Sequence, residues 1–400
     1  MSAAAGMAKV RLMKPANDIF SNLGTTVFTV MSALAVEHKS VNLGQGFPDG
    51  NGPDDVRAKA AEYLNDQPNQ YPPMMGAIEL RQAVAHHAKR FYGLDVDWQS
   101  EVMVTSGGTE ALAASFFGLI EPGDEVVLIE PLYDSYLPIV RRAGGIPKLV
   151  RLTPPHWELP RDELAAAFGP KTKAIVINTP MNPTGKVFTA EELEFIAGLV
   201  RKHDVYAICD EVYEHLTFDG RKHVTLMSLP GMRERTLRIG SAGKALSLTG
   251  WKVGYVTGAA AALQPLAKAH QYLTFTTPPN LQRAVAYGLS KDAAYFDMLA
   301  SDLQRKRDYM SDGLKKLGFG VLESQGTYFV NADFKAFGFN GNDVAFCRHL
   351  TTEAGVTPIP VSAFYEGPGP DTIIRFAFCK DDATLKEALA RLARHFGKTV

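Results

Sequence analysis

One lysine of the chain lies among small residues that leave space beside its amine. The segment Ser241-Ala-Gly-Lys244-Ala follows a short, mostly apolar run at residues 236–239, and a second cation, Lys252, comes eight positions later. The hydroxyls of Ser241 and Thr249 bracket Lys244. Hydroxyls together with a lysine suit a phosphate, and a lysine held apart from water suits imine formation. An ordinary solvated loop lysine is the alternative, and this segment alone does not decide between them.

Two other polar segments directly follow apolar runs of strand length. Asp210 comes after residues 206–209, where a carboxylate would keep a pyridine nitrogen protonated and Tyr213 would bond a neighbouring ring oxygen. Asn182 follows residues 174–177 and precedes a proline, so its backbone is biased towards extended geometry and its amide is available to a phenolate oxygen. For Asp210, an acidic cap on the next helix is the alternative.

The segment Ser106-Gly-Gly-Thr109 follows a third apolar run, at residues 102–105. Glycines at the start of a helix let backbone N–H groups face an anion, which predicts a phosphate cradle, although helices also begin with such residues for capping alone. Gly185-Lys186 is not a nucleotide-binding P-loop. Pro180 stands where that motif requires its first glycine, and Val187 replaces its Ser or Thr.

Arg375 interrupts an otherwise apolar strand pattern at residues 373–378. A charge in such a strand needs a partner or a water-filled cleft, and the strand itself offers no carboxylate. A guanidinium that faces a cavity would bind a substrate carboxylate through two hydrogen bonds. A structural ion pair with a distant acid is the alternative.

The composition favours a small-molecule partner. With 400 residues, 46% of them hydrophobic, the chain is long enough for two or three domains, and its net charge of −1 exerts no long-range pull on nucleic acid or an anionic membrane. Its three cysteines, Cys209, Cys347 and Cys379, are far apart and lack CxxC spacing, so we expect a reducing compartment and neither disulfides nor a metal site. Residues 1–15 lack the long apolar segment of a signal peptide, so we expect a frayed N-terminal tail. The chain also has no apolar run long enough to span a membrane, and we expect a cytoplasmic protein.

The middle of the chain alternates short apolar runs with helical patterns. Runs that are apolar on both faces predict a parallel sheet covered by helices on both sides, an α/β domain over residues 50–290. Thr189 with Glu192 three residues later predicts a capping box at a helix start. From about residue 303, longer helices and strands at 327–330 and 373–378 predict a smaller α+β domain with antiparallel pairing.

These features occur in the order of a known enzyme family. Ser-x-x-Lys followed by Gly-Trp-Lys-Val-Gly resembles the Schiff-base segment of the class I aminotransferases of the pyridoxal-phosphate fold type I superfamily, and the resemblance covers about residues 20–395. The segment Gly250-Trp-Lys-Val-Gly-Tyr255 is similar to the corresponding segment in the branch of the family that contains kynurenine, glutamine and methionine aminotransferases. The resemblance implies the fold type I architecture, with a large domain at 50–290 and a discontinuous small domain at 16–49 and 291–400.

The resemblance also implies roles for individual residues around pyridoxal 5′-phosphate. Lys244 forms the imine with the cofactor, Asp210 pairs with the pyridine nitrogen, and Tyr133 stacks on the ring. Asn182 and Tyr213 contact the ring hydroxyl, so the catalytic residues are Lys244, Asp210 and Tyr213. The phosphate is held by Gly108, Thr109, Ser241 and Lys252.

Two further implications concern the partner subunit and the substrate. Tyr71 matches the tyrosine that reaches the phosphate from the neighbouring subunit, which implies a homodimer with shared active sites. Gly46, Asn182 and Arg375 match the positions that bind the substrate carboxylate. Thr109 stands where some kynurenine-type members carry a tyrosine, which argues against a preference for kynurenine.

The implied reaction is a ping-pong transfer of an α-amino group to a 2-oxo acid, in which the freed amine of Lys244 shuttles the substrate α-proton. Residues 44–48, 271–275 and 359–364 supply aromatic and apolar side chains without an obvious second arginine. We therefore expect neutral donors such as methionine, glutamine, aromatic or kynurenine-like amino acids. Alternatives are an N-succinyl-diaminopimelate or aspartate aminotransferase and a β-lyase on the same scaffold. A pyridoxal-phosphate-sensing regulator is disfavoured, because about twenty residues before the match are too few for a helix-turn-helix domain.

Overall fold

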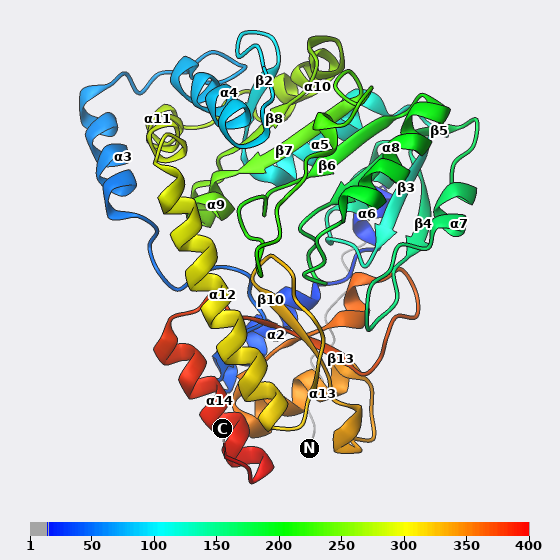
Figure 1. Cartoon of the computed structure of the whole chain (residues 1–400), viewed down its shortest axis with the longest axis vertical. Helices are drawn as coiled ribbons and strands as arrows, with labels where there is room; N and C mark the ends of the chain where they lie inside the picture. Colours follow the sequence, from blue (N-terminus) through cyan, green and yellow to red (C-terminus); the bar gives the residue numbers. More distant parts are fainter. Residues whose placement is uncertain (1–13, 15, 400) are drawn as a thin grey trace.

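The computed structural model describes residue 14 and residues 16–399 (Figure 1). Except for Lys14, the predicted N-terminal tail at residues 1–15 lies outside the described residues. A large sheet with flanking helices occupies the upper part of Figure 1, and a smaller sheet with the C-terminal helices lies below it. The long helix α12 (Ala293–Lys316) runs from the upper part into the lower part.

The large sheet has seven strands in the order β2-β8-β7-β6-β5-β3-β4. Pairing is parallel from β7 through β4, whereas β8 is antiparallel to both of its neighbours. The prediction of a mostly parallel sheet is therefore confirmed. The bounds are β2 Val102–Thr105, β3 Glu125–Glu130, β4 Ile146–Arg151, β5 Thr172–Asn178, β6 Tyr206–Asp210, β7 Thr236–Ser241 and β8 Gly254–Thr257.

Helices cover both faces of this sheet, as the doubly apolar strands predicted. In β3, Val126 and Leu128 belong to the apolar cluster with helices α5 and α10, whereas Val127 and Ile129 belong to the cluster with α7 and α8. The predicted capping box of Thr189 and Glu192 is present at the start of α8. The helices around the sheet are α3 Asp54–Asp66, α4 Ile78–Tyr92, α5 Gly107–Leu119, α6 Tyr136–Arg142, α7 Arg161–Ala166, α8 Ala190–His203, α9 Ala242–Ala245, α10 Ala260–Leu273 and α11 Pro279–Leu289.

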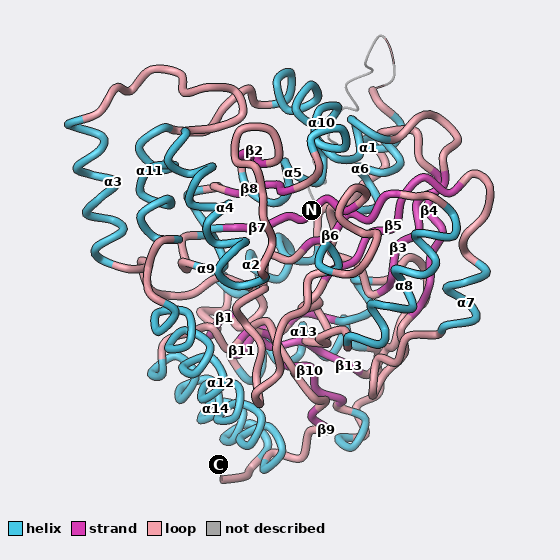
Figure 2. Tube along the Cα trace, turned by 45° about the horizontal axis from the view of Figure 1, so that its top comes forward, coloured by secondary structure: helices cyan, strands magenta, loops and turns pink. Residues whose placement is uncertain are grey.

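The smaller sheet is antiparallel, in the order β12-β13-β10-β9. A separate two-stranded pair joins β1 to β11 in parallel, so the segment near residue 41 lies beside the segment near residue 356 (Figure 2). The bounds are β1 Val41–Asn42, β9 Gly320–Val321, β10 Phe329–Asp333, β11 Val356–Thr357, β12 Ile359–Pro360 and β13 Ile373–Ala377, with helices α1 Asp18–Ser21, α2 Val27–Glu37, α13 Asp343–His349 and α14 Asp382–Phe396.

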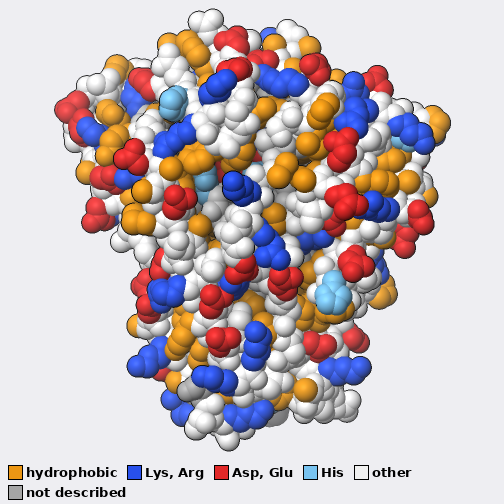
Figure 3. Space-filling view, in the orientation of Figure 1, with side chains coloured by type: hydrophobic (Ala, Val, Ile, Leu, Met, Phe, Trp, Pro, Cys, Tyr) orange, Lys and Arg blue, Asp and Glu red, His pale blue; other side chains and the backbone are white. Residues whose placement is uncertain are grey.

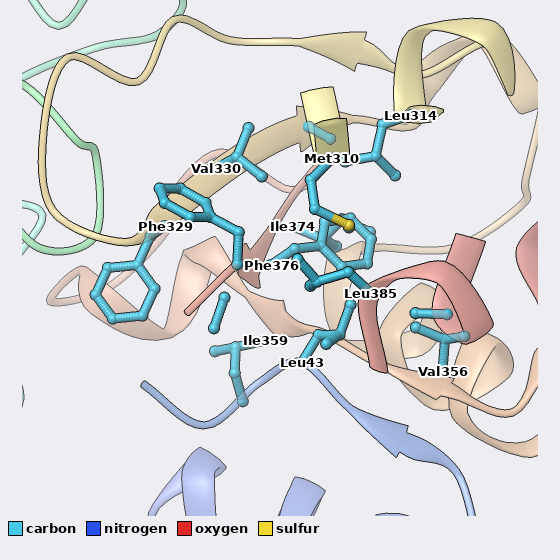
Figure 4. Packing of buried hydrophobic residues seen from close by; sticks show 14 of the residues in the cluster. Leu43, Met310, Leu314, Phe329, Val330, Val356, Ile359, Ile374, Phe376 and Leu385 are labelled. Atoms are coloured by element: carbon cyan, nitrogen blue, oxygen red, sulfur yellow. The ribbon is translucent and has the colours of Figure 1, made fainter. Parts of the chain in front are cut away.

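A continuous apolar core holds the smaller sheet to its helices (Figure 4). Leu43 from the N-terminal segment packs in the same cluster as Met310 of α12, Phe376 of β13 and Leu385 of α14, and all four side chains are fully buried. Burial of such side chains stabilises a fold by roughly 1.5–3 kcal/mol each. The N-terminal segment is thereby fixed against the C-terminal part of the chain.

The surface is mixed in charge. On the face drawn in Figure 3, basic and acidic side chains are interspersed, in keeping with the net charge of −1. Among the described residues, no helix combines the length and apolar character that crossing a membrane requires.

Candidate active site

A pocket of about 280 Å³ lies where the carboxyl ends of β5, β6 and β7 face the smaller sheet. Asn178 is paired in register with Asp210, and Asp210 with Ile239 shortly before the end of β7. In open α/β sheets, ligands bind at this edge. The pocket is lined by Phe28, Gln45, Gly46, Gly107, Gly108, Thr109, Leu112, Tyr133, Asp134, Asn178, Asn182, Asp210, Val212, Tyr213, Ser241, Gly243, Lys244, Thr249, Lys252, Phe329 and Arg375.

One end of the pocket is built to receive an anion. The first turn of α5 presents Gly108 and Thr109 there, and Ser241 and Lys252 complete the same wall. Gly107 has φ +78°, and a Cβ added to it would lie 3.3 Å from Nζ of Lys252, so a larger residue would crowd the amine. Backbone N–H groups, hydroxyls and an ammonium around one space are the donors that a phosphate requires.

Lys244 projects into the pocket from α9, the short helix that follows β7. Its Nζ lies 2.6 Å from the hydroxyl oxygen of Tyr328. Burial lowers the pKa of Lys244 to about 8, assisted by the positive charges of Lys252 and Arg375 and opposed by Asp210. About a tenth of the amine is therefore neutral at pH 7, against well under about a thousandth for an ordinary lysine, and only the neutral form acts as a nucleophile or a proton acceptor.

Asp210 ends β6 and is 6% exposed. The hydroxyl of Tyr136 donates to its Oδ2 at 2.7 Å. Burial raises the pKa of Asp210, while the hydrogen bond from Tyr136 and the charge of Lys244 act in the opposite direction. A buried carboxyl of this kind gains from a cationic partner, which a protonated ring nitrogen would supply.

Asn182 and Tyr213 line the same pocket as Lys244. The backbone N–H of Asn182 donates to Oδ1 of Asn178 at 2.7 Å, and the side-chain amide of Asn178 donates to the carbonyl of Asp210 at 2.9 Å. Burial raises the pKa of the Tyr213 hydroxyl well above its usual range, so this hydroxyl remains a proton donor. These contacts hold the ends of β5 and β6 in one fixed arrangement.

Arg375 reaches the pocket from the middle of β13 and is 1% exposed. Its Nη1 donates to Oδ1 of Asn182 at 2.7 Å and its Nη2 donates to the carbonyl of Gly44 at 2.9 Å. Among the described residues, its acceptors are the amide oxygen of Asn182 and the carbonyl of Gly44, neither of them a carboxylate, and its Nε has no hydrogen-bond partner. Burial lowers the pKa of Arg375 to about 10, although the group stays charged at neutral pH. The alternative of a structural ion pair therefore receives no support from the described residues.

The structure brings every predicted site residue into the pocket except Tyr71. Tyr71 is 81% exposed on the single chain, and its ring meets Phe275 edge to face with centroids 5.4 Å apart. Its place in the active site of a partner subunit stays a prediction.

Several residues around the reacting groups were not predicted. Tyr136 and Tyr328 each form a hydrogen bond to a predicted site residue through a buried hydroxyl, and Gln45, Phe28 and Phe329 line the pocket. In the sequence, these aromatic residues are indistinguishable from core residues. The sequence carried no signal for Tyr328, which falls inside the strand predicted at 327–330 and lies at the amino end of β10.

The donors in this pocket fit pyridoxal 5′-phosphate. An anion cradle, an amine with a lowered pKa, a buried carboxyl and an aromatic ring, Tyr133, converge on one space of suitable size. The unpartnered Nε of Arg375 leaves a hydrogen-bond donor for a substrate carboxylate beside that space.

Comparisons with known proteins give the same picture. Residues 38–392 match the family model of aminotransferase class I and II. A probable N-succinyldiaminopimelate aminotransferase of Mycobacterium tuberculosis is 43% identical over 380 residues, which cover 92% of this chain and 96% of the relative. Human kynurenine–oxoglutarate transaminase 1 is 40% identical over 88% of this chain and 92% of its own. A crystal structure from Escherichia coli, identified as having a methionine aminotransferase function, superposes with a TM-score of 0.92 at 38% identity, covering 95% of this chain and all of the other.

Proposed function

This chain belongs to the class I and II aminotransferases, and we propose that it transfers the α-amino group of a neutral amino acid to a 2-oxo acid. It is an enzyme of fold type I, and its cofactor is pyridoxal 5′-phosphate. When bound, this cofactor supplies an aldehyde that takes up the amino group and a pyridinium ring that withdraws electrons from the substrate α-carbon.

The observation that carries the proposal is the convergence of Lys244, Asp210 and Arg375 on one pocket. Arg375 binds the α-carboxylate and so fixes the α-carbon. Nζ of Lys244, partly neutral at working pH, accepts the α-proton and later returns a proton. Asp210 keeps the ring nitrogen protonated, and the hydroxyl of Tyr136 holds Asp210 in place.

The remaining pocket residues would bind and orient the cofactor. Gly108, Thr109, Ser241 and Lys252 would hold the phosphate, Tyr133 would stack on the ring, and Asn182 and Tyr213 would contact the ring hydroxyl. This assignment is supported by the anion-binding character of the α5 end and by the position of each side chain on the pocket wall. Gly46 would border the substrate carboxylate with Asn182 and Arg375.

Lys244 can be tested directly. Borohydride reduction of the holoenzyme should fix the cofactor to the peptide that contains Lys244, and Lys244→Ala should lose both the label and turnover. A label on another lysine would show that this assignment is wrong.

A neutral substrate side chain is supported by the charges of the pocket. Within the described residues of this chain, the cations that line it are Lys244, Lys252 and Arg375, each with a proposed role at the cofactor or the α-carboxylate. Phe28 and Phe329 offer apolar surface instead. A second buried carboxylate without a cation is strongly penalised, so aspartate should be a poor donor.

N-succinyl-diaminopimelate is the second candidate substrate, because a relative at 43% identity carries that probable activity. The experiment is a comparison of kcat/KM for methionine, glutamine, phenylalanine, kynurenine, aspartate and N-succinyl-diaminopimelate with 2-oxoglutarate as acceptor. We expect one of the neutral donors to lead. A clear lead for either of the last two donors would overturn the preference.

We also propose a cytoplasmic homodimer with shared active sites. The strong exposure of Tyr71 supports a role outside its own pocket, and the three buried, unpaired cysteines suit a reducing compartment. Mixing Tyr71→Ala with Lys244→Ala subunits tests the sharing, since one intact site should form in the heterodimer. A mixture no more active than either parent would argue against it.

The proposed division of the chain is a large cofactor-binding domain at 50–290 and a small domain at 16–49 and 291–400. The seven-stranded sheet falls within the first range, and the pairing of β1 with β11 joins the two segments of the second. Limited proteolysis should cut between these units before it cuts within either.

A further inference from the structure

The hydroxyl of Tyr328 lies between Lys244 and the loop that contains Gly44 and Gly46. It is 2.6 Å from Nζ of Lys244 and 2.6 Å from the carbonyl oxygen of Gly46. A carbonyl can only accept, so the single hydroxyl proton of Tyr328 points to Gly46 and its oxygen accepts from Lys244. The direction of both hydrogen bonds is therefore determined.

The backbone around Tyr328 holds this hydroxyl in place. Thr327, the residue before it, has φ +68°, a left-handed conformation that costs a non-glycine residue free energy and persists only where the surroundings fix it. Its N–H donates to the carbonyl of Leu216 at 2.9 Å, and its Oγ1 accepts from the N–H of Phe329 at 3.2 Å. Tyr328 itself is 2% exposed.

The acceptor on the other side is equally constrained. A Cβ added at Gly46 would lie 2.5 Å from Cζ of Phe329 and 3.3 Å from Cε2 of Tyr328, so the loop runs close against both rings. Two residues earlier, the carbonyl of Gly44 accepts from Arg375. One short loop thus contacts both the tyrosine that holds the lysine and the arginine proposed to hold the substrate.

We propose that Tyr328 is a positioning residue that holds the free amine of Lys244 in the pocket after the substrate has displaced this lysine from the cofactor. This inference rests on the proposed aminotransferase function and adds a residue to it. By accepting from Nζ, the hydroxyl limits the positions open to a long, flexible side chain, so the amine stays within reach of the α-proton. Because the same hydroxyl donates to the carbonyl of Gly46, the position of the amine is tied to the loop whose Gly44 carbonyl accepts from Arg375.

The contact also favours the charged form of the lysine, because an ammonium donates a stronger hydrogen bond than a neutral amine. Burial and the charges of Lys252 and Arg375 oppose the charge on Nζ, whereas the carboxylate of Asp210 favours it. Cys379 also lies nearby, but burial raises the pKa of its thiol to about 11, so it is uncharged near neutral pH. Removal of the Tyr328 hydroxyl should therefore lower the pKa of Lys244. The difference between a charged and a neutral hydrogen bond corresponds to roughly half to one pH unit.

The test uses the cofactor-free enzyme, in which Lys244 is free. The rate at which acetic anhydride acylates Lys244 is measured against pH by peptide mass spectrometry for wild type and Tyr328→Phe. We expect the midpoint to fall by about half to one pH unit in the variant. Tyr328→Met, which also lacks the hydroxyl, should give the same direction of shift.

The control is Tyr365→Phe, which also removes a buried tyrosine hydroxyl. Tyr365 is not among the residues that line the pocket, and its hydroxyl donates to the carbonyl of Leu152 at 3.1 Å. This variant should leave the midpoint of Lys244 unchanged. An unchanged midpoint in Tyr328→Phe, or an equal shift in Tyr365→Phe, would overturn the proposal.

Turnover is measured separately. In the holoenzyme, we expect Tyr328→Phe to lower kcat at least tenfold with little change in KM, and to raise the kinetic isotope effect of α-deuterated substrate. Equal kcat values in Tyr328→Phe and wild type would also overturn the positioning role. Since acylation requires no turnover, failure of this proposal is distinguishable from failure of the wild-type enzyme to transaminate.

Discussion

Arg375→Lys separates charge from geometry at the proposed carboxylate site. The guanidinium already donates to Asn182 at 2.7 Å and to Gly44 at 2.9 Å, and it lies over the ring of Phe329 with 3.8 Å between Cζ and the ring centroid. A lysine would keep the charge but lose the planar fork, so it could not satisfy these two acceptors and a carboxylate together. The substrate would then lose a two-point contact in a buried site.

The expected loss follows from the burial of the site. Arg375 is 1% exposed, and Arg375→Lys keeps the charge but removes a hydrogen bond to a charged group, which contributes about 1.5–3 kcal/mol. At about 1.4 kcal/mol for each factor of ten, kcat/KM should fall by about 10-fold to 140-fold. An exposed pair would cost less than about 1 kcal/mol, which is under tenfold, so the size of the effect distinguishes a buried contact from a surface one.

The assay compares two amines in the first half-reaction of the holoenzyme, followed by cofactor absorbance. Methionine carries an α-carboxylate, whereas 3-methylthiopropylamine is the same molecule without it. Arg375→Lys should reduce the rate constant kcat/KM for methionine by the factor above and leave that for the amine nearly unchanged. Equal losses for both amines would refute the reasoning, because they would mean that Arg375 acts on the fold or the cofactor and not on the carboxylate.

Arg307→Lys provides the matched control. Arg307 is 8% exposed, pairs with Asp219 on an outer loop and lies outside the set of pocket-lining residues. Its replacement removes a buried guanidinium fork of the same kind from another place in the chain. We expect a change in the free energy of unfolding and no change in the ratio of the two amine rate constants.

Two more predictions concern charge. Asp210→Asn should retain the cofactor, measured by absorbance after dialysis, but slow α-proton removal in single-turnover experiments by about 100-fold or more, because loss of one buried charge partner costs about 3–5 kcal/mol; a fully active variant would contradict this role. Burial lowers the pKa of His87 to about 3 and that of His215 to about 4, whereas an unfolded histidine titrates near about 6.5. Their neutral forms therefore contribute stability that is complete above about pH 6.5 and is lost towards pH 4, by up to about 1.4 kcal/mol per pH unit for each. His87→Gln should flatten the pH dependence of urea unfolding between pH 7 and 5, while His86→Gln, at the exposed neighbouring position, should not; equal slopes would contradict the assignment.

The sequence predicted the part of the site that follows strand ends. Asp210 and Ser241 terminate buried strands, and Gly108 and Thr109 begin the helix after another. The carboxyl ends of parallel strands meet at one edge, so the type and spacing of these residues were enough to place them together. Arg375 was predicted for a different reason, since a charge within an apolar strand requires an explanation wherever the strand lies.

The sequence did not predict contacts made by hydroxyls on otherwise apolar side chains. Tyr136 bonds Asp210 from the first residue of α6, and Tyr328 bonds Lys244 from the residue before β10. Each pair is separated by 74 or 84 residues in the chain. Such pairs depend on the way helices and the two sheets pack on each other, and a buried tyrosine in the sequence carries no sign of which acceptor its hydroxyl will meet.

The segment that carries Asp210 and Tyr213 has a second set of contacts behind the pocket. Glu211 and Glu214 both pair with Arg238, with 2.6 Å between Nε of Arg238 and Oε2 of Glu211, and all three charges are at most 4% exposed. Arg238 lies on β7, the strand that leads directly into the segment of the catalytic lysine. Because removal of one partner from a buried ion pair costs about 3–5 kcal/mol, this triad strongly opposes sliding of β6 against β7. These three charges lie outside the set of pocket-lining residues, and they hold together the strands that lead to the acid and the lysine of the proposed mechanism.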